Sequence, residues 1–296
     1  MIFNSALKEI KINPATVLLW IGVLVTVSSC YQKQEGCLDI RATNFDLEAD
    51  IACEDCCEYP DLKLKFLHRE VLPDTIFNIG YADSVYVDGA GNPFRINSLK
   101  YYVSNIRLLS TDGTEAVVNE TIDIETPTGI ITFTDDFLLI SGSFSSALTA
   151  GSFSTIKTFD KIRFFVGLDS DLQSVDPSTL PDNHVLAINQ DTSMYDIQNG
   201  MYLMGNHEIF KDTTAIDTIV RVLTIPMFYG PVELTLDFPE EIALPEGFDL
   251  EISLQVDVPD WFANSDVRFS SDQQLFTNIV SKLSETFSVV AVTVDN

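Results

Sequence analysis

Apolar and polar residues alternate along much of this chain with the period of two that is typical of β-strands. Leu62–His68 shows the alternation most clearly, and Ser98–Ser110 is rich in the β-branched and aromatic residues that favour strands. Four more segments have the same character: Lys161–Leu168, Asp217–Ile225, Val232–Phe238 and Asp249–Val258. Turn residues such as Asp88–Gly89 and Asp112–Gly113 separate them. Short strands separated by turns predict a mostly β protein, an antiparallel sandwich.

One helix is expected near the C-terminus. In Ser271–Glu285 the apolar residues Leu275, Ile279 and Leu283 recur on one face, and Ser271 stands three residues before Gln274 in a capping-box pattern. A last strand follows at Phe287–Val294. We expect residues 61–296 to form one domain.

The N-terminus has the pattern of an export signal. Basic residues precede an apolar run, Val17–Val27, that is shorter than the roughly 20 residues needed to span a bilayer. The following "VSSC" resembles a lipobox, which predicts a lipoprotein signal peptide over residues 1–29 and lipid on Cys30. An ordinary signal peptide or a short anchor is the alternative. Tyr31, where some sorting patterns have Asp, favours an outer-membrane lipoprotein of the cell envelope by resemblance to those patterns.

The chain is strongly acidic, with a formal net charge of -27. Such a charge repels the phosphates of nucleic acids and anionic lipid headgroups, so it argues against a nucleic-acid partner. It is compatible with cations and basic partners. The membrane is therefore expected as a partner only through the lipid anchor.

Residues 30–60 are expected to form a lipidated tether and a cysteine-rich module. Export places Cys37, Cys53, Cys56 and Cys57 in an oxidising compartment, where disulfides are favoured over a zinc site. Four cysteines allow three connectivities, and the one that joins the adjacent Cys56 and Cys57 is disfavoured by strain. Cys37–Cys56 with Cys53–Cys57, and Cys37–Cys57 with Cys53–Cys56, both remain open.

No catalytic signature stands out, so the sequence predicts a binding protein rather than an enzyme. The chain contains three histidines, His68, His184 and His207, and neutral imidazole is a good ligand for copper or zinc. Their spacing alone favours separate structural roles.

Several segments resemble the MbnP family of exported β-sandwich proteins. These segments are Phe94–Leu108 ("FRINSLKYYVSNIRL"), Phe164–Leu186, Met194–Met204 ("MYDIQNGMYLM") and "QLFTNIVSKLSETFSV". The resemblance implies copper bound by two histidines and an oxidised tryptophan, with a di-haem peroxidase as partner. His68 and His184 fall where relatives often have histidine, and His207 is a further candidate.

The chain departs from the family in one motif. Tyr195 and Ile197 stand where the resemblance implies a Trp-x-Trp pattern, so Tyr195 becomes a candidate substitute and the oxidised tryptophan is not expected. Met194, Met201 and Met204 are possible soft ligands for copper, although core packing is the commoner role for methionine.

The cysteine module also resembles a small repeat of exported proteins, which is carried here by Cys37, Asp39, Ala42, Asn44, Phe45 and Ala49. Its oxygen ligands, on Asp39, Asn44, Asp46 and Asp50, would suit calcium, although the spacing is not that of an EF-hand.

From the resemblance to the MbnP family, the expected function is copper binding beside an envelope redox partner. The alternative is a surface adhesion or assembly module that binds protein or glycan without metal.

Overall fold

The computed structural model describes residues 32–142, 146–172, 175–211, 220–227 and 230–295. The predicted signal peptide and Cys30 lie outside the described residues. Strands dominate, and a single α-helix of the described chain lies near the C-terminus, so the predicted fold class is confirmed. The strands are β1 (Glu35–Gly36), β2 (Ile51–Ala52), β3 (Asp61–Leu72), β4 (Thr75–Asn78), β5 (Tyr86–Val87), β6 (Pro93–Ser110), β7 (Glu115–Ala116), β8 (Thr121–Thr126), β9 (Gly129–Thr134), β10 (Leu138–Ser141), β11 (Leu148–Ser152), β12 (Thr158–Val166), β13 (Tyr195–Asp196), β14 (Met201–Phe210), β15 (Val220–Pro226), β16 (Val232–Ala243), β17 (Asp249–Asp257) and β18 (Phe287–Asp295). The helix is α2 (Asp272–Thr286).

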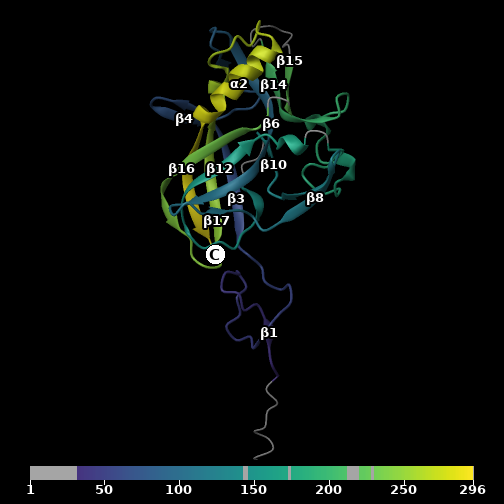
Figure 1. The fold of residues 1–296 in the computed structure, drawn as a ribbon. Coiled ribbons are helices and arrows are strands. Elements are labelled where there is room, and N and C mark those ends of the chain that lie inside the picture. Colours follow the sequence, from purple (N-terminus) through teal and green to yellow (C-terminus); the bar gives the residue numbers. More distant parts are fainter. Residues whose placement is uncertain (1–31, 143–145, 173–174, 212–219, 228–229, 296) are drawn as a thin grey trace, which may run out of the picture.

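Two sheets pack face to face to form the sandwich (Figure 1). The larger sheet has the order β13-β14-β6-β12-β16, with β5, β7 and β10 on β6 and β15 on β14. The smaller sheet has the order β11-β3-β17-β18, with β4 also paired to β3. Most pairings are antiparallel as expected, but β3 and β17 run parallel, with Leu62 opposite Leu250. Parallel neighbours need a long connection, and almost the whole domain lies between these two strands.

The core lies between the sheets and beneath α2. Strand β3 alternates buried and partly exposed residues along Asp61–His68, which matches the predicted period of two. The helix buries Leu275, Ile279 and Leu283 as predicted, and Ser271 and Gln274 form the expected capping box.

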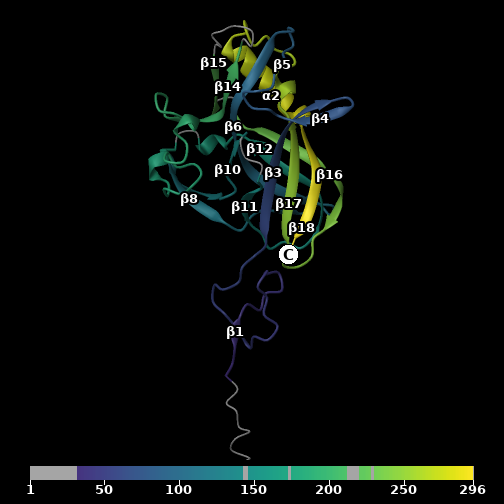
Figure 2. The ribbon, with the colours of Figure 1, turned by 180° about the vertical axis from the view of Figure 1, so that it is seen from behind.

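The domain has two distinct ends (Figures 1 and 2). The cysteine module around β1 lies beyond one end, beside the C-terminus, and residues 35–60 are called the collar below. The helix and the β3–β4 hairpin lie toward the opposite end, where β4 projects from the body. No helix in the described part of the chain is long and apolar enough to span a membrane.

Candidate functional site

His68 lies in the core because it continues the inward-facing row of β3 that contains Leu64 and Phe66. Its Nδ1 lies 2.7 Å from Oη of Tyr81, and its Nε2 lies 3.0 Å from Oη of Tyr101. Burial lowers the pKa of His68 to about 4, so the ring is neutral at physiological pH. A neutral imidazole has one N–H and one acceptor nitrogen, and the two tyrosines occupy both.

The loop after β4 is shaped to bring Tyr81 onto His68. A Cβ at Gly142 would fall 2.1 Å from Oη of Tyr81, so only glycine leaves room for the phenol. Ala82, which follows Tyr81, has a left-handed φ of 62°, which is uncommon for a residue with a side chain. Hydrogen bonds with the Ile96 carbonyl and the Arg95 guanidinium hold Ala82 in that conformation.

His207 also faces the core, from β14 of the larger sheet. Its ring centroid lies 5.6 Å from that of Trp261, whose Nε1 donates a 2.9 Å hydrogen bond to Oγ1 of Thr286. Burial lowers the pKa of His207 to about 4, and the nearby His68 adds a smaller contribution in the same direction. Tyr101 connects the two sides, since it bonds to His68 and meets Trp261 edge-on at 5.9 Å.

His184 lies elsewhere, in the loop before β13. The backbone amide of Leu186 donates to Nδ1 of His184 at 3.2 Å, so the proton of the neutral ring is on Nε2. That Nε2 lies 3.0 Å from Oδ1 of Asp135, to which it donates. The ring also meets Phe137 edge-on at 5.9 Å.

The His184 ring borders a surface hollow of about 450 Å³. Carboxylates of Asp61, Glu120 and Asp135 line it beside the apolar Ile122 and Phe137. Glu120 is already engaged, because both of its oxygens accept hydrogen bonds from Ser152. The hollow therefore presents an acidic, half-apolar surface in which the two ring nitrogens of His184 are occupied.

The structure brings His68 close to His207 and does not join either of them to His184. His68 and His184 share no hydrogen-bond partner or ring contact. In the described residues, no group of three or more His, Cys, Asp or Glu side chains is arranged to hold a metal ion. As folded, the two histidines predicted as copper ligands offer no free pair of nitrogens to one ion.

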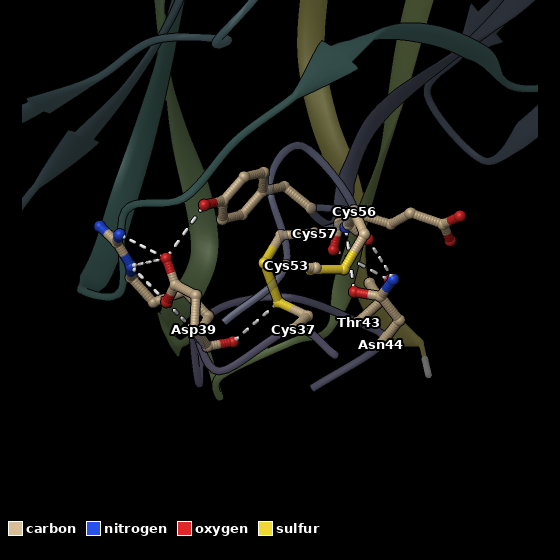
Figure 3. The surroundings of a disulfide bond; sticks show 10 residues. Cys37, Asp39, Thr43, Asn44, Cys53, Cys56 and Cys57 are labelled. Atoms are coloured by element: carbon tan, nitrogen blue, oxygen red, sulfur yellow. Dashed lines mark hydrogen bonds and ion pairs between the residues drawn. A yellow bond between two sulfur atoms is a disulfide. The ribbon is translucent and has the colours of Figure 1, made fainter. Parts of the chain in front are cut away.

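The collar contains two disulfides, which join Cys37 to Cys57 and Cys53 to Cys56 (Figure 3). This is one of the two connectivities left open by the sequence. Asn44 closes the same loop, since its Nδ2 donates to the Cys56 carbonyl and its Oδ1 accepts from the Glu58 amide.

The predicted calcium ligands of the collar bind protein groups instead of converging. Asp39 pairs with Arg41 at 2.6 Å and accepts a hydrogen bond from Tyr59 (Figure 3). The Arg41 guanidinium lowers the pKa of the Asp39 carboxyl. Asp46 and Asp50 both accept hydrogen bonds from Gln34. These carboxylates stabilise the collar through hydrogen bonds and an ion pair to neighbouring residues.

Comparison with known proteins connects this fold to a family. The MbnP family model matches residues 61–280, which is most of the chain. The chain belongs to the MbnP family. A solved structure, MbnP from Methylosinus trichosporium, is similar with a TM-score of 0.39 and 9% identity, over 69% of this chain and 78% of that chain. No curated protein matches the chain.

The divergent motif of this MbnP domain is packed rather than open. Tyr195 begins β13, and its ring meets that of Tyr202 at 5.2 Å across the β13–β14 pair. Tyr202 donates a hydrogen bond to the Leu186 carbonyl at 2.7 Å, while Met194 and Met204 are buried in the core. Tyr195 therefore serves as a packed aromatic, and Ile197 beside it is 74% exposed.

Sequence reasoning missed four residues that shape these sites: Tyr81, Tyr101, Asp135 and Trp261. The hydrogen-bond partners of His68 lie 13 and 33 residues away, so local periodicity gives no sign of them. Gly142 makes room for Tyr81 in space, but it follows Tyr81 by some sixty residues, so the sequence does not connect the two.

Proposed function

We propose that this MbnP-family protein is an exported, lipid-anchored module that docks a protein partner through the β3–β4 hairpin. The β3–β4 hairpin carries this proposal because it exposes four large apolar side chains: Val71, Leu72, Ile76 and Phe77. Ile76 is 52% exposed and Phe77 is 54% exposed, on a two-stranded projection joined by the Pro73–Asp74 turn.

The strand register leaves neither face of the β3–β4 hairpin covered. Val71 stands opposite Ile76 on one face, while Leu72 and Phe77 lie diagonally on the other. Hairpins that belong to a core bury one face and leave the other polar. Burying an exposed Val, Leu, Ile or Phe stabilises by roughly 1.5–3 kcal/mol, so a partner gains from covering this projection.

Position and charge support the same function. The β3–β4 hairpin lies away from the collar, so a lipid on Cys30 would hold the domain with this projection directed away from the bilayer (Figure 2). Glu70 and Asp74 flank the apolar side chains, and the chain as a whole has a net charge of -27. The complementary partner surface is an apolar groove with a basic rim.

Copper binding fits the geometry of the histidines less well than partner docking fits the β3–β4 hairpin. The resemblance that suggests copper assigns it to His68 and His184, whose ring nitrogens are engaged by Tyr81, Tyr101, Asp135 and the Leu186 amide. The residues present therefore do not form a ready copper site.

Site-specific photo-crosslinking tests the docking proposal. A benzophenone amino acid replaces Phe77 in the cells that produce the protein, and the matched control places it at Ile130, a 73% exposed residue on β9. We expect one discrete protein adduct from position 77, none from position 130, and loss of the adduct when Ile76→Asp is added. Equal adducts from both positions, or none from position 77, would overturn the proposal.

A further inference from the structure

The hydroxyl of Tyr101 is enclosed in the core, where its direction can be deduced. The side chain is 2% exposed, and the one hydrogen-bond partner described for its Oη is Nε2 of His68. Buried tyrosine hydroxyls donate to a partner, since an unused donor in the core is strongly unfavourable. Tyr101 therefore donates its proton toward Nε2, which acts as the acceptor.

The direction of the hydrogen bond from Tyr101 to His68 determines the direction of the bond between His68 and Tyr81. Because burial keeps His68 neutral, a ring that accepts at Nε2 has its proton on Nδ1. Nδ1 then donates to Oη of Tyr81 at 2.7 Å. Tyr81 is partly exposed and His68 is the one hydrogen-bond partner described for its hydroxyl, which leaves solvent as the acceptor for its own proton. Three side chains thus form a directed hydrogen-bond chain from the core to the surface.

The surroundings of Tyr101 suit the loss of an electron as well as a proton. Its ring meets Trp261 edge-on at 5.9 Å and the His68 ring at 5.9 Å, and the His68 and Tyr81 centroids are 6.3 Å apart. Burial raises the pKa of Tyr101 well above its ordinary value, so the phenol keeps its proton until it is oxidised. Oxidation must then be coupled to proton transfer.

We propose that Tyr101 is a redox-active tyrosine whose proton leaves through His68 and Tyr81. A one-electron oxidant of the high-potential metal-complex class, acting from the Tyr81 side, takes one electron. The O–H bond of Tyr101 breaks as an N–H bond forms at Nε2, the Nδ1 proton moves to Oη of Tyr81, and Tyr81 releases its own proton to water. The products are a neutral tyrosyl radical, the reduced oxidant and one solvent proton.

The loop architecture supports a role beyond packing. The glycine at 142 and the left-handed Ala82 place Tyr81 on Nδ1, at the outer end of the chain. Tyr202 provides the internal comparison, since it is equally buried but donates to a backbone carbonyl, which cannot take up a proton. The geometry therefore predicts oxidation at Tyr101 and none at Tyr202.

Laser-flash oxidation with photogenerated tris(bipyridyl)ruthenium(III) tests this inference on the mature protein. Electron paramagnetic resonance and transient absorption report the tyrosyl radical. We expect a radical that is lost in Tyr101→Phe and unchanged in Tyr202→Phe. Its formation should slow roughly tenfold or more in His68→Gln and Tyr81→Phe, because a positioned proton acceptor contributes at least that much. A tyrosyl signal that persists in Tyr101→Phe would overturn the proposal.

A second measurement uses the wild-type protein, so a folding defect in a variant cannot affect it. Radical formation coupled to the proton chain should be slower in D₂O than in H₂O, and near-ultraviolet circular dichroism checks that each variant keeps its packing. A rate that is equal in the two solvents, or a rate unaffected by His68→Gln in a folded variant, would reduce the chain to a structural role and refute the inference. None of these substitutions replaces an exposed apolar side chain of the β3–β4 hairpin.

Discussion

The carboxylate of Asp136 accepts a 2.7 Å hydrogen bond from the backbone amide of Ile106, inside a bulge of β6. It also accepts from the amide of Asn105, which has a left-handed φ of 53°, and from the Arg107 guanidinium. Asn105 and Ile106 together oppose one residue of β12, so the carboxylate pairs the amides that the bulge leaves without a strand partner.

Replacing this carboxylate should destabilise the domain more than almost any surface change. Asp136→Ala would leave the amides of Asn105 and Ile106 and the half-buried Arg107 guanidinium without this acceptor. We therefore expect a loss of about 3 kcal/mol in the free energy of unfolding. Urea denaturation measures it, with Asp237→Ala as the control, because Asp237 makes an exposed ion pair with Lys161. Equal stability losses in the two variants would contradict the role of Asp136.

Acid should weaken the fold through its two core histidines. Burial lowers the folded-state pKa of His68 and of His207 from 6.5 to about 4, so the unfolded chain binds more protons between these values. Their stabilising effect is complete above pH 6.5 and is lost as the pH falls toward 4. The loss is about 3 kcal/mol for each histidine at 1.36 kcal/mol per pKa unit.

Urea midpoints measured from pH 7 to pH 4.5 check this dependence. A His68→Gln variant should show a shallower decline than the wild type, because one of the two titrating groups is gone. Stability that stays flat between pH 6.5 and 5 would show that the histidines are hydrated or already protonated in the folded protein.

The fold was predictable from sequence because its signals are local. The period of two in Leu62–His68 and the helical spacing of Leu275, Ile279 and Leu283 depend only on near neighbours, and both match the structure. The β8–β9 hairpin, Thr121–Thr134, was missed because the alternation in β8 involves only two apolar residues, Ile122 and Ile124, which is a short signal.

The sites were less predictable because their contacts are distant in sequence. His68 was singled out as a ligand by type, yet its environment depends on Tyr81 and on Tyr101, which arrives from the other sheet. Similarly, the four cysteines predict a clasp, but the choice between two pairings depends on how the collar loop turns. No local pattern encodes either relationship.

The collar should depend mainly on the disulfide that closes the longer loop. Cys37 and Cys57 are 20 residues apart, against three for Cys53 and Cys56. The double replacement Cys37→Ser/Cys57→Ser should therefore destabilise the collar by about 3 kcal/mol, and Cys53→Ser/Cys56→Ser by less. Proteolysis within residues 35–60 reports the loss, and tandem mass spectrometry of the unreduced protein should find Cys37 linked to Cys57. A Cys37–Cys56 link would contradict the structure.

Copper should bind weakly if the histidines keep their present partners. Coordination through one ring nitrogen of His68 would break its bond to Tyr81 or to Tyr101, and coordination by His184 would break its bond to Asp135 or to the Leu186 amide. We expect well under one copper per chain after loading and dialysis, measured by plasma mass spectrometry. One tightly held copper that disappears in His68→Ala/His184→Ala would instead establish the site implied by the family resemblance.

Membrane attachment should depend on a single cysteine. Because the run Val17–Val27 is short for a bilayer span, we expect anchoring through lipid on Cys30. Cys30→Ala should abolish labelling with a fatty-acid analogue and shift the protein from the membrane fraction to the aqueous fraction. The Cys53→Ser/Cys56→Ser variant serves as the matched control, since it removes two cysteines of the collar and should keep both the label and the membrane location. If Cys30→Ala stays with the membrane after a carbonate wash, the N-terminal segment itself is the anchor.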